Sequence, residues 1–165
     1  MSSYNRRSFL SLAAASPLLA ACGFEPVYGT NGHASGLLDQ VVVDAPTDSN
    51  TYLMVRELED RLGRASTGTY GLLVAGDVTE RSAGKTITGI TSRYDVIGDA
   101  TYALRDLTSG QVVTSGKASN YTGYSATGTT VATLAAQTDS YERLMVMLTD
   151  QIMTQLWAWS AKAAS

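Results

Sequence analysis

The stretch ITSRYDVIGDATYALR, residues 90–105, alternates between two faces without a break. Its even positions carry Ile, Ser, Tyr, Val, Gly, Ala, Tyr and Leu, whereas its odd positions are mostly polar or charged. This period of two predicts a long strand within Thr86–Leu107 that buries its even face. At about 3.3 Å per residue, the alternating part is on the order of 50 Å long. Because most strands have roughly 3–10 residues, we expect a bend, a bulge near Gly98, or a projection beyond the domain.

The segments on either side of this strand read as its partners. Downstream, Thr108-Ser-Gly110 predicts a turn, and residues 111–124, rich in Ser, Thr, Asn and Tyr, predict an antiparallel strand. Upstream, Tyr70–Glu80 predicts another strand, with Leu72, Val74 and Val78 on one side. Ser82-Ala-Gly84 predicts the turn between this strand and the long one.

Two further segments have the apolar spacing of amphipathic helices. The first covers Thr51–Arg64 and can be capped by Asp48, Ser49 or Asn50. The second covers Thr130–Ala161. The apolar positions are Met54, Val55, Leu58 and Leu62 in the first helix, and Leu134, Tyr141, Leu144, Met145, Leu148, Ile152, Leu156 and Trp159 in the second. We interpret both stripes as surfaces that face the core.

A short apolar run, Leu37–Val43, completes the pattern as a buried strand before the first helix. The order β-α-β-β-β-α predicts an α+β domain over residues 37–165, with two helices packed on one face of a small mixed four-stranded sheet. The opposite sheet face is then left polar. It carries Arg93, Asp95, Asp99, Thr101 and Arg105.

Residues 1–21 have the pattern of an export signal. Arg6 and Arg7 precede an uncharged run, Phe9–Ala21, whose 13 residues fall short of the roughly 20 that span a bilayer. The run ends in Leu19-Ala20-Ala21-Cys22, which resembles the lipobox of lipoprotein signals. We therefore expect removal of the signal and acylation of Cys22.

Residues 22–36 are rich in glycine and read as a lipidated tether. Gly23 follows the cysteine, and by resemblance to the sorting rule of proteobacteria this favours transfer to the outer membrane. The sequence NRRSFL, residues 5–10, also resembles a twin-arginine export motif. The alternative is that its two arginines only supply positive charge for the general secretory route.

The composition excludes several classes of protein. The formal net charge is −3, and loss of two arginines with the signal leaves 10 basic against 15 acidic residues, a net of −5. Such a chain is a poor general binder of nucleic acid. Cys22 is the only cysteine and His33 the only histidine, so an intrachain disulfide and a Cys/His zinc site are impossible. We expect no metal and no cofactor other than the covalent lipid.

Three blocks together resemble a known family. They are CGFEPVY at residues 22–28, RYDVIGDATY at 93–102 and YSATGTTVATLA at 124–135. With the lipoprotein signal and the element order, they resemble the alphaproteobacterial form of the lipopolysaccharide-assembly lipoprotein LptE over essentially the whole chain. None of the blocks is a catalytic signature, and the resemblance implies a protein that is not an enzyme.

The resemblance implies an anchored position on the periplasmic face of the outer membrane. The family's partner there is the large β-barrel LptD, which it plugs and whose assembly it supports, so that lipopolysaccharide reaches the cell surface. Large outer-membrane barrels have polar interiors, which suits the Ser-, Thr- and Tyr-rich hairpin at residues 86–124. The candidate barrel contacts are Tyr94, Tyr121 and Tyr124.

Contact with lipopolysaccharide itself is a separate hypothesis. Members of the family have been proposed to bind the phosphorylated glycolipid through basic residues, and Arg and Lys pair well with phosphate. The candidates here are Lys85, Arg93, Arg105 and Lys117. The alternative is that these charges only solvate the hairpin and protect its edge from aggregation.

Two other functions remain open from the residues alone. The chain can be an accessory or pilot lipoprotein of another envelope complex, such as a secretin. It can also be an enzyme with a carboxylate pair, Asp95 with Asp99 or Asp44 with Asp48. The second reading is the weaker one, because residues four apart on a strand are about 13 Å apart, too far for glycoside cleavage.

Overall fold

A computed structural model describes residues 36–163 of the 165-residue chain. The expected signal peptide, Cys22 and nearly all of the tether lie outside these residues. The elements are β1 (Val41–Val43), α2 (Ser49–Leu62), β2 (Tyr70–Lys85), β3 (Thr91–Asp106), β4 (Val112–Ser125) and α3 (Thr130–Ala163). This order confirms the predicted α+β fold.

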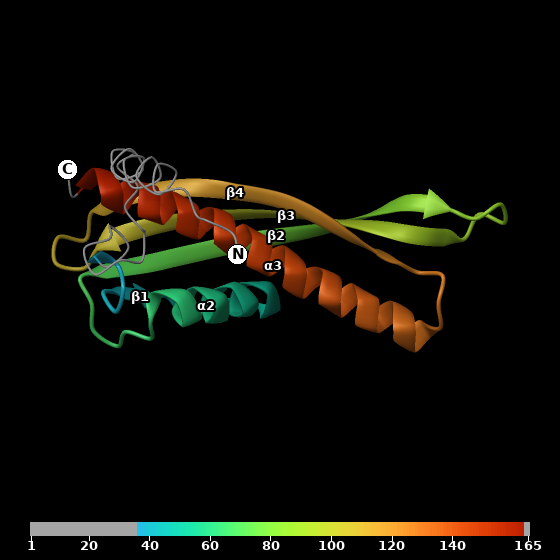
Figure 1. The fold of residues 1–165 in the computed structure, drawn as a ribbon, viewed down its shortest axis with the longest axis horizontal. Coiled ribbons are helices and arrows are strands. Elements are labelled where there is room, and N and C mark those ends of the chain that lie inside the picture. The colour runs from blue at the N-terminus through green and yellow to red at the C-terminus, as the bar shows by residue number, and fades with distance from the viewer. Residues whose placement is uncertain (1–35, 164–165) are drawn as a thin grey trace, which may run out of the picture.

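The four strands form one mixed sheet in the order β1-β2-β3-β4 (Figure 1). β1 runs parallel to β2, and the other neighbours are antiparallel. The two helices meet the same sheet face. An added Cβ would lie 3.4 Å from Met54 Sδ of α2 at Gly76, and 2.9 Å from Leu144 Cδ2 of α3 at Gly98. The molecule is therefore two layers, with one sheet face covered and the other open.

The long alternating strand is confirmed as β3. Its even residues face the core, where Val96, Ala100, Tyr102 and Leu104 are buried. The expected bulge near Gly98 is wrong, because pairing runs without a shift through Gly98, opposite Val78 and Asn120. Gly98 instead lets α3 approach the sheet backbone closely, since a side chain there would meet Leu144 and Leu148.

The predicted turn at Ser82–Gly84 is also wrong. β2 continues to Lys85 with an irregular register at these residues, and the chain reverses over residues 86–90. Gly89 has a φ of 82°, and the backbone N–H of Thr86 donates to the carbonyl of Ile90 at 2.8 Å. The hairpin formed by β2 and β3 is therefore the one that projects beyond both helices (Figure 1), rather than the predicted hairpin at residues 86–124.

The first strand is shorter than predicted, because residues 37–40 form a turn in place of its first half. The backbone N–H of Asp39, a residue with a φ of 57°, donates to the carbonyl of Leu62 at 2.7 Å. This bond links the turn to the end of α2. Leu37 is still buried, so its apolar character was read correctly while its local structure was not.

Helix α2 begins at a capping box that settles which of three candidates caps it. Asp48 Oδ1 accepts from the backbone N–H groups of Asn50 and Thr51 at 2.8 and 2.9 Å. The Thr51 hydroxyl in turn accepts from the backbone N–H of Asp48 at 2.9 Å. The helix thus starts at Ser49, two residues before its predicted start, and Gly63 ends it.

Helix α3 matches its predicted range within two residues and buries Leu144, Leu148, Ile152 and Leu156 completely. Leu134, assigned to the buried stripe from the sequence, is 62% exposed instead. The first turns of α3 diverge from the sheet in Figure 1, so the stripe has nothing to pack on there. Of the residues described, no helix is long and apolar enough to cross a bilayer.

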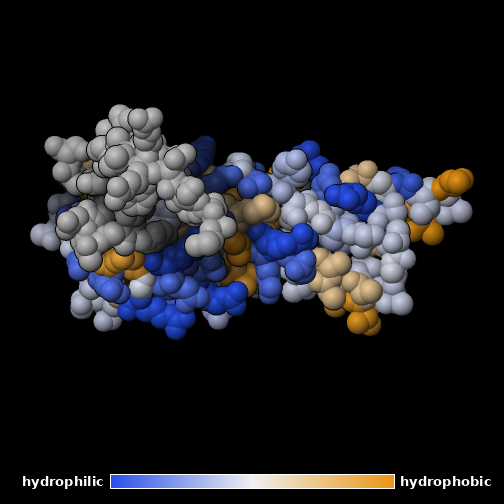
Figure 2. Space-filling model, viewed as in Figure 1, coloured by the Kyte–Doolittle hydropathy of each residue, from blue (hydrophilic) through white to orange (hydrophobic). Residues whose placement is uncertain are grey.

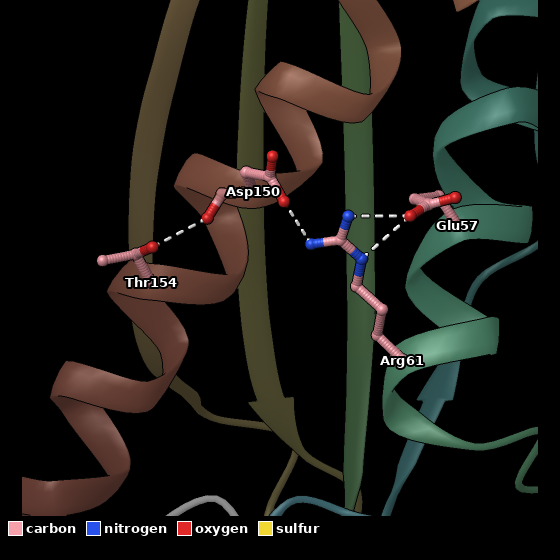
Figure 3. A network of polar contacts seen from close by, with 4 residues as sticks. All are labelled: Glu57, Arg61, Asp150 and Thr154. Carbon is pink, nitrogen blue, oxygen red and sulfur yellow. Dashed lines mark hydrogen bonds and ion pairs between the residues drawn. The ribbon is translucent and has the colours of Figure 1, made fainter. Parts of the chain in front are cut away.

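A polar network joins the two helices. Arg61 of α2 donates from Nε to Glu57 at 2.9 Å and pairs with Asp150 of α3 (Figure 3). Glu57, Arg61 and Asp150 lie at the edge of the interface between the two helices. The apolar residues beneath them provide the burial. The pair therefore fixes the relative position of α2 and α3 more than it adds stability.

Two glutamines of α3 cover the free edge of β4. Gln151 both accepts from the backbone N–H of Ser119 at 3.1 Å and donates to its carbonyl at 3.2 Å. Gln155 donates to the carbonyl of Lys117 at 2.8 Å. These amides stand where a further strand would bind, so this edge is protected from strand addition.

Candidate functional site

The helices leave one face of the sheet uncovered. The strand registers place on it the odd residues of β3 and their partners on β2 and β4. Its members include Leu73, Ala75, Asp77, Thr79 and Arg81 of β2, Arg93, Asp95, Ile97, Asp99, Thr101, Ala103 and Arg105 of β3, and Ser115, Lys117, Ser119 and Tyr121 of β4. The polar character predicted for this face is confirmed.

This face combines small hydroxyl groups with a few exposed apolar side chains. Tyr121 is 73% exposed and Leu73 is 48% exposed. Asp77 stands opposite Asp99 across the β2–β3 pair, and the Ser119 hydroxyl donates to Asp99. The surface can therefore form many uncharged hydrogen bonds, while the two facing carboxylates make its middle acidic.

The four predicted glycolipid contacts do not come together. Lys85 is the last residue of β2. Arg93 lies near the distal end of β3, and Arg105 lies at the other end of the same strand. Lys117 lies on β4, opposite Thr101 of β3. Twelve residues of strand separate Arg93 from Arg105, which is about 40 Å. No single phosphate group can engage all four cations.

Arg105 already has a partner within the domain. Its Nη1 and Nη2 donate to the two carboxylate oxygens of Asp44 at 2.8 and 2.6 Å. The hydrogen bonds to Asp44 raise the pKa of Arg105, with burial opposing them. This bidentate pair ties β3 to the chain that follows β1, so contact with an external anion would require it to open.

One cation of the distal end, Arg81, was missed by the sequence reading, which named its neighbours Lys85 and Arg93. Arg81 is exposed, pairs with Asp95 in register, and lies close to Arg93, whose Nε is 3.8 Å from Asp95. Residues 81–94 contain Arg81, Lys85 and Arg93 and no acidic residue. The absence of Asp and Glu over this stretch is the signal that could have revealed it.

The three tyrosines predicted as barrel contacts do not share one face. Tyr121 lies on the open face, whereas Tyr94 and Tyr124 are even-numbered neighbours on the covered face. Their rings stack 5.3 Å apart, and Tyr124 is buried. Only Tyr121 is therefore available to a partner that binds the open face.

Tyr94 and Tyr124 instead belong to a polar cluster that closes the distal end of the core. Gln137 of α3 donates to Glu80 at 2.9 Å. Burial, together with the nearby Glu80 carboxylate, raises the pKa of Tyr124 to about 12. Burial and Glu80 also raise the pKa of Tyr141. Beyond this cluster, the β2–β3 hairpin has no helix over it (Figure 1).

The described residues offer no obvious metal site. Between Gly36 and Ala163, no group of three or more His, Cys, Asp or Glu side chains is placed to hold a metal ion. What the described residues present to solvent is a broad open sheet face and a distal hairpin.

Comparison with known proteins decides the family. A family model described as lipopolysaccharide-assembly, LptE, matches residues 38–156. This chain belongs to the LptE family. The match covers nearly the whole described domain, from just before β1 to Leu156, the last fully buried leucine of α3. Among curated proteins, no sequence matches.

Solved structures share the LptE fold of this chain. A Caulobacter crescentus protein described as a lipoprotein is 24% identical, with a TM-score of 0.65 over 78% of this chain and 96% of its own. Rare lipoprotein B from Shewanella oneidensis is 12% identical, with a TM-score of 0.58 over 76% of this chain and 98% of its own. Lipoprotein B from Nitrosomonas europaea is 12% identical, with a TM-score of 0.57 over 75% and 85%. At these identities the likeness concerns the fold.

Proposed function

We propose that this LptE-family chain is anchored to the periplasmic face of the outer membrane through lipid on Cys22. There it fills the lumen of the LptD β-barrel and supports assembly of that barrel. In this position it assists delivery of lipopolysaccharide to the cell surface. Membership of a lipopolysaccharide-assembly family supports this proposal, and so does the lipobox at residues 19–22.

The observation that carries the proposal is the open sheet face. A four-stranded sheet with helices on one side only leaves a broad surface whose side chains are mostly polar or charged. The interior of a large outer-membrane barrel is also polar and wet. Serine, threonine and tyrosine hydroxyls on the open face can hydrogen-bond to such a wall directly or through water. An apolar face could not form these hydrogen bonds.

The elongated shape supports insertion along the barrel axis. The 16 residues of β3 extend for about 53 Å, and the apolar band of an outer-membrane barrel is about 25 Å tall. A chain inserted lengthwise would therefore reach through the whole band. The first described residue, Gly36, lies against Ser160 near the end of α3, at the end of the domain opposite the projecting hairpin (Figure 1).

The proposal includes direct contact between lipopolysaccharide and some of the four predicted cations. Arg93, Lys85 and Lys117 are exposed, and of these only Arg93 has a close carboxylate. Arg105 is held by Asp44 and is the weakest of the four candidates. Exposed cations near the distal end can pair with lipid phosphates without disrupting the domain.

Affinity purification of the full-length chain from membranes in mild detergent tests the partner. We expect the LptD barrel to co-purify, and a Cys22→Ser variant to lose its membrane anchorage. Recovery of a different envelope complex without any barrel, as the pilot-lipoprotein alternative requires, would overturn the proposal.

Binding assays with purified lipopolysaccharide test the cations. Arg93→Ala and Lys117→Ala are each expected to weaken binding, while Arg64→Ala, an exposed arginine of the helical side, serves as the matched control. Unchanged affinity in both test variants would remove these residues from the account.

A further inference from the structure

One edge of the sheet is open along most of β2. The short strand β1 pairs with only Tyr70–Leu72 of β2, while β3 occupies the other edge of β2 throughout. The last bond on the β1 side joins the backbone N–H of Asp44 to the carbonyl of Leu72 at 2.9 Å. From Val74 to the irregular register at Ser82, no strand or backbone hydrogen bond among residues 36–163 lies on this edge.

The free edge has a defined set of backbone groups. The backbone N–H of Tyr70 donates toward β1, to the carbonyl of Gln40 at 3.0 Å, so the even residues of β2 face this edge. Successive residues of a strand direct their backbone groups to opposite edges, and the odd residues therefore bond to β3. The even residues beyond β1 that direct an N–H and a carbonyl to the free edge are Val74, Gly76, Val78 and Glu80.

The two edges of the sheet are treated differently. On β4, the side-chain amides of Gln151 and Gln155 bond to the outward backbone groups. On β2, no side chain of the described residues does so, and the edge is blocked only at its two ends. β1 closes one end, and the irregular register with the exposed Arg81 and Lys85 closes the other, as bulges and cations do on natural sheet edges. Residues 74–80, between these ends, have about the length of an average strand.

A groove follows this edge on the side of the sheet that the helices cover. The start of α2 and the first half of α3 line a pocket of about 280 Å³ whose walls include Leu53 and Tyr141. Figure 2 shows hydrophobic surface between the start of α2 and the neighbouring part of α3, among hydrophilic side chains. The α2 wall lies near Gly76, where an added Cβ would be 3.4 Å from a methionine of α2. The α3 wall lies near Glu80, which accepts from Gln137 at 2.9 Å.

The two sides of the edge differ in chemistry, and this difference selects the occupant. A strand added here directs alternate side chains to opposite sides of the sheet. On the covered side they enter the groove beside Leu53 and Tyr141, which favours apolar residues. On the other side they extend the open face beside Asp77 and Thr79, which favours polar residues. A strand of alternating apolar and polar residues therefore fits, and this is the pattern of the strands of an outer-membrane barrel.

A second copy of this chain fits the edge less well. The residues of its own β2 on the covered side are held by its own helices, since Val78 packs against the core and Glu80 accepts from Gln137. These side chains cannot enter the groove of another copy, which would stay empty. A closed barrel offers no strand either, because each of its strands already has two neighbours. The occupant that remains is a strand of a barrel that has not yet closed.

We propose that the free edge of β2 adds a membrane-spanning strand of the partner barrel before that barrel closes. The apolar side chains of the added strand lie over the groove, and its polar side chains continue the open face. This inference rests on the proposed function and deepens it, because it names how the chain supports assembly of the barrel. Main-chain hydrogen bonds supply the affinity. The groove keeps apolar side chains out of water until lipid covers them.

Peptide binding to a chain that starts at Gly23 tests the edge. The buried apolar core lies between Leu37 and Leu156, so this chain retains the fold. The probe is a synthetic peptide of about ten residues, the length of a membrane-spanning strand, in which valine and threonine alternate between terminal lysines. We expect the peptide to bind, with binding followed by NMR and by hydrogen exchange of the chain's amides.

The pattern of exchange separates strand addition from other modes of binding. Added protection is expected at the amides of Gly76, Val78 and Glu80, because these face the free edge. The amides of Asp77 and Thr79 already bond to β3 and should change little. Binding to the open face or to the groove alone would not produce this alternation.

Two sets of variants test the hydrogen bonds themselves. Val78→Pro removes one outward N–H and spares the ladder to β3, since proline is tolerated where a strand N–H faces solvent. It should lower the affinity about tenfold, whereas the matched Val78→Ala, which keeps the N–H, should lower it less than about threefold. Peptides methylated on the backbone nitrogens of all valines or of all threonines leave the protein unchanged. Only the peptide whose methyl groups face the edge should lose binding.

Three outcomes would overturn the inference. They are absence of peptide binding, protection gained by odd and even residues alike, and equal binding of the two methylated peptides. Protection of the even amides in the free chain that disappears on dilution would assign the edge to a second copy instead.

Co-purification of the barrel from membranes judges the proposed function separately. A chain that recovers the barrel but does not bind the peptide keeps the proposed function and loses strand addition. A chain that binds the peptide but recovers no barrel contradicts the proposed function, and with it the barrel as the source of the strand. If both hold, Val78→Pro should recover less barrel than Val78→Ala.

Discussion

The half of the sheet under the helices and the half that projects beyond them use the same strands for different purposes. Under the helices, even residues of β2 and β3 such as Leu72 and Leu104 are buried against α2 and α3. Past the cluster around Glu80, the same strands carry mostly serine, glycine, threonine and basic residues, and the turn between them carries the exposed Ile87 and Ile90. One continuous pair of strands is therefore part of the core at one end and projects into solvent at the other.

The largest expected contrast concerns stability. Leu148→Ala should lower the free energy of unfolding by about 3 kcal/mol, because it leaves a cavity beneath α3 where the side chain is fully buried. Ile87→Ala should change it by less than about 0.5 kcal/mol, because nothing packs on that side chain. Urea denaturation followed by circular dichroism measures both, and similar losses in the two variants would contradict the division.

The two strand-borne arginines sharpen the comparison. Arg105→Gln should lower the free energy of unfolding by about 1 kcal/mol, since it breaks a bidentate, partly buried pair with Asp44. Arg93→Gln should change it by less than about 0.3 kcal/mol, because its contact with Asp95 is exposed and long. A double-mutant cycle with Asp44→Asn isolates the first pair, and a coupling near zero would count against its structural role.

The cap of α2 gives a prediction that depends on pH. The backbone N–H of Thr51 lowers the pKa of Asp48, with partial burial opposing it. Because the pKa is lower in the folded state, the ionised Asp48 stabilises the fold at pH values above the ordinary pKa of 3.8. This stabilisation is lost as the pH falls through the folded-state pKa. Asp48→Ala should therefore cost about 1 kcal/mol at pH 7 and less near pH 3. A cost that does not change with pH would show that the carboxylate is not the cap.

The last effect is expected mainly at alkaline pH, where Tyr124 closes the core. Burial, and then Glu80, raise the pKa of Tyr124 from 10 to about 12. A raised pKa stabilises the fold below pH 10, and this stabilisation is lost as the pH rises from 10 to 12. Tyr124→Phe should change stability by less than about 1 kcal/mol at pH 7 and flatten its decline above pH 10. If stability falls just as steeply above pH 10 in the variant, groups other than Tyr124 cause the loss.

Periodicity was enough to predict the covered half. The alternation of residues 90–105 predicted the long strand β3 and its buried face, and the helical spacing predicted both helices, because packing enforces these patterns. The pattern failed where packing ends. Leu134 fits the apolar stripe of α3 but lies beyond the sheet, and Ser82–Gly84 resembles a turn but continues as strand.

The candidate site was predicted less well, because residue type says little about which side chains converge. Arg105 reads as a free cation, yet Asp44, 61 positions away, holds it. Tyr124 reads as a hairpin side chain, yet its even position places it under α3. Arg81 was overlooked, although the lack of acidic residues over residues 81–94 marks it, and its register opposite Asp95 places it on the same face as Arg93.

Site-specific photocrosslinking in membranes tests the central claim most directly. Photoreactive side chains at Tyr121 and Thr101 on the open face should crosslink to the barrel, and the same probe at Glu142 on the solvent side of α3 should do so much less. Crosslinks to the barrel from Glu142 alone, or from none of the three positions, would contradict an account in which the open sheet face lines the barrel wall.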